Sequence, residues 1–265
     1  MMPILNIAGY KFLELLDLES LRERLLGLAR ALNLKGTVLL SPEGINISLA
    51  GREPEVIQFM EALARDPRFA GMRFHQTYSL GYPFRVLKVK VKDEIITLRQ
   101  GDVAPLHNNR ARDISPAQLK TWLDEKRDIT LLDTRNDYEY RFGTFKGAIN
   151  LHMKNFGELP EAVQNLDKHK PLVMFCTGGI RCEKAAIYMQ QQGFTDVYQL
   201  DGGIIGYFAQ VGGAHYEGEC FVFDERIALA ADLGCYGTAQ CHICQGPINV
   251  NDTACRSCVT GACLA

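Results

Sequence analysis

The sequence lacks a hydrophobic run long enough to cross a bilayer, and it has no cysteine before Cys176. Residues 1–9 lack the positively charged start and the cleavage site of a secretory signal peptide. We therefore expect a soluble protein that is not exported. Seven of the nine cysteines lie at or after Cys220. A secreted disulfide scaffold would spread its cysteines through a small, loop-rich fold. We therefore expect reduced thiols and a cytoplasmic location.

A strong excess of one charge is also absent. The net charge is −2, with 14 Lys and Arg against 11 Asp and Glu in residues 1–100 and 15 against 20 in the remainder. This mild asymmetry does not by itself indicate a nucleic-acid partner. With 265 residues, 47% of them hydrophobic and 23% charged, the chain is long enough for two globular domains and a short extension.

Residues 1–98 are predicted to form a ferredoxin-like domain with acylphosphatase-like topology. An apolar stripe indicates a first amphipathic helix, made by Leu18, Leu21, Leu25, Leu28, Ala29 and Leu32. The other expected elements are strands at 4–13, 37–40, 45–49 and 84–91 and a helix at 54–65. This order is βαββαβ. Residues 9–17 lack the glycine-rich loop and arginine of an acylphosphatase, so that activity is not expected.

The last expected strand of this domain carries a cationic stripe. Period-two alternation places Lys88, Lys90 and Lys92 on one face and Val89 and Val91 on the other. Such a stripe predicts contacts with a nucleic-acid backbone. Lysines also protect edge strands against aggregation, so a purely structural interpretation stays open.

A second domain of the α/β class, with a parallel sheet, is expected at 115–216, after a linker at 99–114. Ser115 followed by Pro116 is a typical helix start. Apolar segments at 129–133, 171–175 and 197–201 have the composition of buried parallel strands. Because the carboxyl ends of parallel strands meet at one edge of a sheet, we expect Asp133, Cys176 and Asp201 to lie close together.

The segment Cys176-Thr177-Gly178-Gly179-Ile180-Arg181 separates the strand at 171–175 from an expected helix at 182–192. Two glycines let backbone N–H groups turn toward the sulfur, and the positive end of the helix favours an anion. We therefore expect Cys176 to ionise readily and act as a nucleophile. An inert core cysteine would not require the glycines and the arginine. Cys182 either resolves an oxidised Cys176 as a disulfide or only fills the first helical turn.

The extension at 217–265 carries two CxxC motifs. Cys241 and Cys244 form the first, and Cys255 and Cys258 form the second, with ten residues between the motifs. Four thiolates in this arrangement suit a tetrahedral structural zinc ion. Cys235, Cys263 and His242 are alternative ligands, and a set of free thiols or disulfides is the alternative to zinc.

The second domain resembles the rhodanese domain at 132–135, 138–139, 143, 147–150, 176–181 and 200–203. The resemblance implies that Cys176 carries a persulfide or another covalent adduct. It also implies that the backbone of the loop forms an anion cradle, made by Thr177, Gly178, Gly179, Ile180 and Arg181. The Arg181 side chain is implied to add a fixed positive charge. Asp133 and Arg135 are implied to organise the loop rather than react.

Nearly the whole chain resembles the bacterial rhodanese-related tRNA uridine hydroxylases, through segments 36–46, 176–184 and 218–226 in that order. The resemblance implies oxygen-dependent 5-hydroxylation of uridine 34, the wobble position of tRNA, with Cys176 required and molecular oxygen as co-substrate. The partner would be the anticodon region of tRNA, bound by the first domain. No flavin, haem, nicotinamide or non-haem iron motif is evident in the sequence, and its six histidines, His107 among them, suggest no facial triad.

Other activities compete with hydroxylation. A sulfurtransferase would pass a persulfide sulfur from Cys176 to a thiol or protein acceptor in ping-pong steps. A non-catalytic module would use the same loop to bind an anionic partner. A cysteine phosphatase is disfavoured, because four residues separate Cys176 from Arg181 where such enzymes have five.

Overall fold

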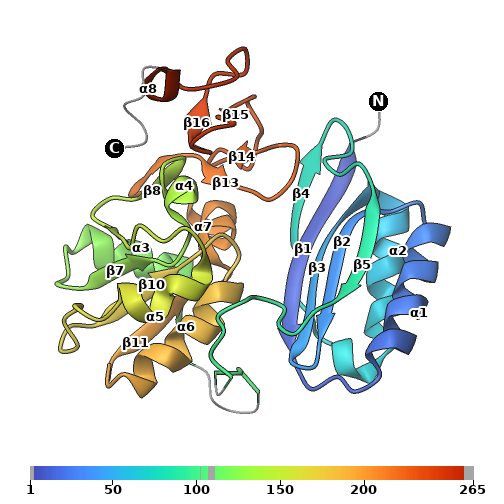
Figure 1. The fold of residues 1–265 in the computed structure, drawn as a ribbon, viewed down its shortest axis with the longest axis horizontal. Coiled ribbons are helices and arrows are strands. Elements are labelled where there is room, and N and C mark those ends of the chain that lie inside the picture. Colours follow the sequence, from blue (N-terminus) through green and yellow to red (C-terminus); the bar gives the residue numbers. More distant parts are fainter. Residues whose placement is uncertain (1–2, 102, 107–110, 260–265) are drawn as a thin grey trace. The chain divides into compact units, whose positions relative to one another are not determined.

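The computed structural model describes residues 3–101, 103–106 and 111–259 (Figure 1). The chain divides into two compact units, Met1–Arg110 and Ala111–Ala265. Among the described residues, no helix combines the length and apolar character needed to cross a membrane. The mixed fold predicted from the sequence is confirmed, with two changes in strand assignment.

The first unit is a five-stranded sheet in the order β4-β1-β3-β2-β5. Its strands are β1 (Ile4–Phe12), β2 (Lys35–Ser41), β3 (Gly44–Arg52), β4 (His75–Ser79) and β5 (Leu87–Val91). Its helices are α1 (Leu18–Ala31), α2 (Glu53–Ala64) and the short 3₁₀ helix η1 (Pro67–Phe69). In Figure 1, α1 and α2 lie on the same side of this sheet.

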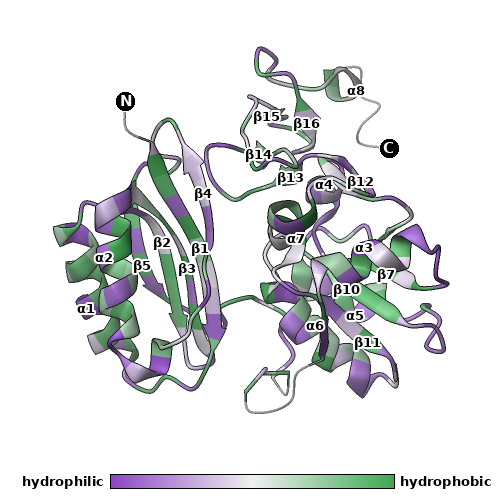
Figure 2. Cartoon of the chain, turned by 180° about the vertical axis from the view of Figure 1, so that it is seen from behind, coloured by the Kyte–Doolittle hydropathy of each residue, from purple (hydrophilic) through white to green (hydrophobic). Residues whose placement is uncertain are grey.

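The core of the first unit lies between those two helices and the sheet. Leu25 of α1 and Phe59 of α2 are buried together with Val38, Ile47 and Val89 of the strands. Both helices carry hydrophobic and hydrophilic residues in alternating bands (Figure 2), as expected where only one face is buried. Lys88 and Lys90 alternate with buried Val89, so they project from the opposite face of the sheet, and both are exposed.

The expectation that residues 84–91 form the fourth ferredoxin-like strand is wrong. His75–Ser79 forms that strand, pairing antiparallel with β1, whereas β5 pairs in parallel with β2 at the other edge of the sheet. Only Thr77 of β4 is buried. Because this edge strand is short and mostly polar, its sequence lacks the apolar alternation that identifies a strand.

The second unit contains a parallel sheet in the order β6-β11-β10-β7-β9. These strands are β6 (Arg112–Ile114), β7 (Thr130–Asp133), β9 (Ile149–Asn150), β10 (Leu172–Phe175) and β11 (Val197–Leu200). Its helices are α3 (Pro116–Asp124), α4 (Asp137–Tyr140), α5 (Leu159–Ala162), α6 (Ile180–Gln191), α7 (Gly203–Val211) and the 3₁₀ helix η2 (Phe156–Glu158). Strand β6 thus occupies residues that the sequence analysis placed in the linker.

Strand β10 is the central strand that leads into the cysteine loop. All four of its side chains are fully buried, so both faces of the sheet are covered at this point. On one face, Val173 and Phe175 pack with Ile204 and Phe208 of α7. The strand therefore delivers Cys176 to the sheet edge from a rigid, fully packed position.

The C-terminal extension begins with two small antiparallel sheets. Strand β8 (Gly143–Phe145) pairs with β12 (Tyr216–Gly218), and β13 (Cys220–Phe221) pairs with β14 (Ala228–Leu229). Phe142 and Phe221 share a small apolar cluster with Ala228. Further along the chain, β15 (Ala239–Gln240) pairs with β16 (Pro247–Ile248), and the short helix α8 (Arg256–Val259) follows.

Candidate functional site

Cys176 follows β10 directly and is fully buried. The backbone N–H of Gly179 donates a hydrogen bond to its Sγ atom over 3.1 Å. Gly179 has φ of +101°, a conformation that residues with a side chain rarely adopt, and it caps the start of α6. The glycine at this position is therefore what turns an amide toward the sulfur.

The environment of Cys176 favours its thiolate. Burial raises the pKa of a thiol, but the Cys182 thiol, the Arg181 guanidinium and the amides of Arg181 and Gly179 outweigh burial, lowering the pKa of Cys176 to about 6. Burial raises the pKa of Cys182 well above its ordinary value, and the neighbouring Cys176 raises it further. At neutral pH, Cys176 is therefore the ionised member of the pair and Cys182 the protonated one.

Arg181 is paired with a buried carboxylate. Its Nη1 and Nη2 atoms donate to Oε2 and Oε1 of Glu139 over 2.7 and 2.8 Å. Glu139 is fully buried and Arg181 is nearly so. Glu139 lies in segment 138–139 of the rhodanese resemblance, but no role is predicted for it from the sequence. The available signal was its capping-box spacing from Asn136, and the Asn136 N–H donates to Oε2 of Glu139 over 3.1 Å at the start of α4.

Asp133 and Arg135 form a second buried ion pair. Nε of Arg135 donates to Oδ1 of Asp133 over 2.9 Å, and Nη2 donates to Oδ2 over 2.6 Å. The same Nη2 atom donates to the carbonyl of Gly143, and the Thr144 hydroxyl donates to Asp133. These contacts join the end of β7 to β8, and none of them involves the Cys176 sulfur.

The turn before α7 closes against the cysteine loop. The N–H groups of Ile204 and Ile205 donate to the carbonyls of Cys176 and Thr177 over 2.9 and 3.1 Å. A Cβ atom on Gly203 would lie 2.5 Å from the Cys176 carbonyl oxygen. The backbone of the loop is thus held from β10 on one side and from α7 on the other.

An exposed aromatic ring from the extension lies beside this loop. Phe223 is 61% exposed, and the Arg181 guanidinium carbon lies 5.7 Å from its ring centroid. Behind it, Phe221 makes edge-to-face contacts with Phe223 and Tyr138, both at 5.2 Å between centroids. The sequence analysis gave Phe223 no role, because nothing in its local sequence indicates proximity to Arg181.

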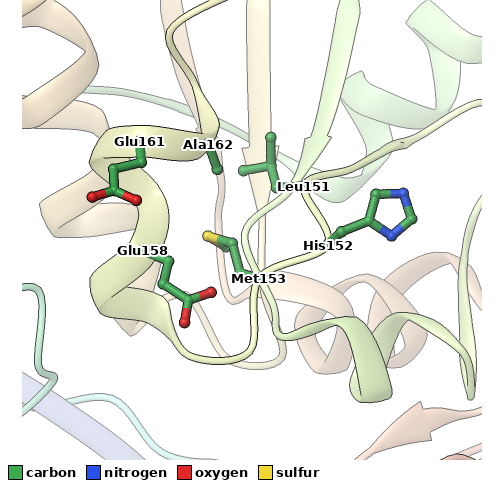
Figure 3. Close-up of a pocket in the computed structure, with 6 residues that line it drawn as sticks. All are labelled: Leu151, His152, Met153, Glu158, Glu161 and Ala162. Atoms are coloured by element: carbon green, nitrogen blue, oxygen red, sulfur yellow. The ribbon is translucent and has the colours of Figure 1, made fainter. Parts of the chain in front are cut away.

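A separate surface pocket lies against η2 and α5 (Figure 3). It is lined by Leu151, His152, Met153, Glu158, Glu161 and Ala162. In Figure 3 the His152 ring points away from the two glutamates. Residues 176–181 do not line this pocket, so the reactive thiolate and this hollow are different sites.

The remaining predicted site residues lie in two other places. The Sγ atoms of Cys241, Cys244, Cys255 and Cys258 all lie within 4.8 Å of one another. Cys235 and His242 are not part of this cluster of described residues, while Cys263 and His107 lie outside the described ranges. Lys88, Lys90 and Lys92 line the edge strand β5 and the residue after it.

Comparison with known proteins gives two family matches. Residues 4–95 match the UPF0176 acylphosphatase-like domain, and residues 115–210 match the rhodanese-like domain. A tRNA uridine(34) hydroxylase of Cupriavidus necator is 46% identical over 93% of this chain and 90% of its own length. One from Variovorax paradoxus is 49% identical over 88% of this chain and 91% of its own length. This chain therefore belongs to the family of tRNA uridine(34) hydroxylases.

Proposed function

We propose that this protein hydroxylates C5 of uridine 34 in the anticodon of tRNA, in the cytoplasm, with Cys176 as the reacting residue and molecular oxygen as co-substrate. Likeness to tRNA uridine(34) hydroxylases along most of the chain is the observation that carries the reaction. The lowered pKa of Cys176 and the amide aimed at its sulfur support the choice of residue.

The reaction replaces C5–H of uracil by C5–OH. One oxygen atom of O₂ enters the base and the other leaves as water, which consumes two electrons and two protons from a reductant. In the first route, the Cys176 thiolate forms a bond to C6 and the electron pair of the C5–C6 double bond moves toward C5 and O4. After oxygenation at C5, loss of the C5 proton and of the thiolate restores the double bond. In the second route, O₂ and the same two electrons first convert the Cys176 thiolate to a sulfenic acid and water. C5 then forms a bond to the sulfenic oxygen as the S–O bond breaks, and loss of the C5 proton restores the double bond and the thiol.

Trapping with a 5-halogenated uridine at position 34 separates these two routes. Addition of Cys176 to C6 predicts a covalent protein–tRNA adduct, seen as a mass shift on the peptide that contains Cys176. The Cys176→Ala variant is the matched control and should form no adduct. Hydroxylation of normal tRNA without any trapped adduct would exclude the addition route and leave the oxidised sulfur.

The sulfurtransferase alternative uses the same loop, because a persulfide on Cys176 would also be held by inward-pointing amides. Nucleoside mass spectrometry of tRNA from a deletion strain distinguishes the two activities. We expect loss of 5-hydroxyuridine derivatives, restored by the parent gene and by Cys235→Ala, whose thiol is exposed and outside the loop. Cys176→Ala should not restore them. Loss of a thiolated nucleoside instead would favour sulfur transfer.

The substrate base is proposed to stack on Phe223. Its ring is exposed and lies beside Arg181 of the cysteine loop. Aromatic side chains hold unpaired bases by stacking. Stacking accepts any base and leaves the edge of the base free to react. The stripe of Lys88, Lys90 and Lys92 is proposed to bind the tRNA backbone.

A further inference from the structure

We propose that Cys241, Cys244, Cys255 and Cys258 form a closed structural zinc site that fixes the C-terminal extension onto the rhodanese domain. Four sulfurs at about 2.3 Å from one tetrahedral zinc ion would lie about 3.8 Å apart. The four Sγ atoms lie within 4.8 Å of one another, and those of Cys244 and Cys255 are 3.7 Å apart.

The backbone presents the first two thiols from a tight turn. Cys241 follows β15, and its N–H donates to the Gly246 carbonyl over 2.8 Å. The Cys241 carbonyl in turn accepts from the N–H of Gln245 over 2.9 Å. Gln245 has φ of +61°, which closes the turn. Both sulfurs of the first CxxC motif therefore come from the tip of the β15–β16 hairpin.

The second pair enters from the start of α8, and one N–H···S contact links it to the first pair while another lies within the second pair. The N–H of Cys255 donates to Sγ of Cys241 over 3.3 Å, and the N–H of Cys258 donates to Sγ of Cys255 over 3.4 Å. A disulfide would join the sulfurs in pairs at about 2.05 Å. Instead, the four sulfurs form one cluster, and those of Cys241 and Cys255 accept hydrogen bonds from backbone amides, as thiolates bound to a metal ion do. With four protein ligands, no position remains for a reacting water.

Residues 235–259 of the extension have little else to hold them in place, because their buried apolar residues are Cys241 and Cys258. Tyr236, Ile243, Val250 and Val259 are large hydrophobic residues that remain exposed. In a segment with so few buried apolar side chains, metal binding supplies the free energy that folds the local structure. The β15–β16 hairpin has only two residues in each strand, so it is not stable alone.

The cysteine cluster is also tied to the active-site region. Nη2 of Arg141 donates to the Cys244 carbonyl over 2.7 Å, and Nε of Arg141 lies 3.2 Å from Oδ2 of Asp137. Arg141 directly follows α4, whose Glu139 holds Arg181 of the cysteine loop. The zinc site therefore anchors residues 239–259 to Arg141, next to the helix that supports the cysteine loop.

The test is the metal content of the full chain purified under reducing, chelator-free conditions. We expect one zinc ion per chain, released when four thiols are titrated with a mercurial reagent. Cys244→Ser and Cys258→Ser should each lose most of this zinc, whereas Cys235→Ser should keep it. Zinc well below one ion per chain, iron in its place, or equal loss in Cys235→Ser would overturn the proposal.

A second measurement covers variants that fail to fold. Stripping metal from the parent protein should increase proteolysis and hydrogen exchange at 239–259, with re-addition of zinc restoring protection, while the sheet around β10 stays protected. Arg141→Met should keep one zinc ion yet expose the same hairpin to exchange. If stripping changes no exchange rate, the site does not fix the extension. Neither readout depends on tRNA hydroxylation, so failure of the proposed function would leave this result intact.

Discussion

At the scale of single residues, burial alone does not decide whether a thiol reacts. Cys176 and Cys220 are both fully buried in the second unit. Burial raises the pKa of Cys220 to about 12, whereas hydrogen bonds and the Arg181 charge bring the pKa of Cys176 to about 6. The difference therefore comes from the Cys182 thiol, the Arg181 guanidinium and the loop amides, which outweigh burial at Cys176, whereas burial outweighs the Arg135 charge at Cys220.

This contrast predicts a titration that belongs to Cys176. The ultraviolet absorbance of the thiolate, measured as parent minus Cys176→Ser, should rise with pH through a midpoint near 6. The thiolate is present above that pH and is lost as the pH falls through it. Cys220→Ser should leave the step unchanged, because the pKa of Cys220 is raised to about 12. A midpoint above about 8, as in an ordinary cysteine, would contradict the activated-thiolate mechanism.

Phe223 gives a second prediction at this scale. Stacking of one base on an aromatic ring is worth about 1–3 kcal/mol. Phe223→Ala should therefore raise KM for tRNA by about fivefold or more, while Phe223→Tyr stays near the parent. Tyr236→Ala is the control, since Tyr236 is a 70% exposed ring elsewhere in the extension. Steady-state kinetics with unmodified tRNA measures this, and an equal effect of the two alanine variants would argue against stacking.

At the scale of elements, the cysteine loop depends on the turn that begins α7. Gly203 has φ of +60°, and a Cβ there would lie 2.5 Å from the Cys176 carbonyl oxygen. Gly193 has φ of +90° but nothing within 4 Å of its Cβ position. Alanine at Gly193 tests only the energetic cost of a side chain at positive φ, whereas alanine at Gly203 adds the cost of displacing the cysteine loop.

We expect Gly193→Ala to cost about 1–2 kcal/mol of unfolding free energy, the usual penalty for a left-handed residue with a side chain. Gly203→Ala should cost more and should also move the pKa of Cys176 upward, because the loop backbone must shift. Chemical denaturation and the thiolate titration measure the two effects. Equal destabilisation of the two variants, with an unchanged titration, would show that the loop does not need this close approach.

The same elements show how far the sequence could predict the structure. The strand at 171–175, the glycines and the following helix are local features, so their pattern predicts the loop. The pairing of Arg181 with Glu139 spans 42 positions and depends on how β10 and α4 pack, which no single-sequence pattern encodes. Strand β4 was missed because a polar edge strand has no apolar period.

At the scale of the whole molecule, the features that indicate function are spread over both units. Of the three segments that carry the family resemblance, 36–46 spans the β2–β3 hairpin of the first unit, and 176–184 forms the loop and the start of α6. The third, 218–226, brings Phe223 beside Arg181. Composition could not predict the last placement, because it requires the β8–β12 pairing that turns the extension back toward α4.

The lysine stripe allows a test of whether the first unit binds tRNA. Lys88 and Lys90 are exposed on the face of the sheet opposite α1 and α2, and Lys92 follows on the same strand edge. Because β5 is an edge strand, protection against aggregation would account for the same lysines. A binding measurement separates the two roles, since neutralising phosphates releases counterions and edge protection does not.

Replacing Lys88, Lys90 and Lys92 by glutamate should weaken tRNA binding and reduce the slope of log K against log salt by about 0.7–0.9 for each phosphate that is no longer neutralised. The control reverses Lys126, Lys168 and Lys170, which are exposed and precede β7 and β10, at the sheet end opposite Cys176. Both variants change the net charge by the same amount, so a general charge effect would lower affinity equally in the two. Binding measured from low to moderate salt should show weaker affinity only for the β5 variant. If that variant binds like the parent and instead aggregates, the stripe protects an edge and tRNA binds elsewhere.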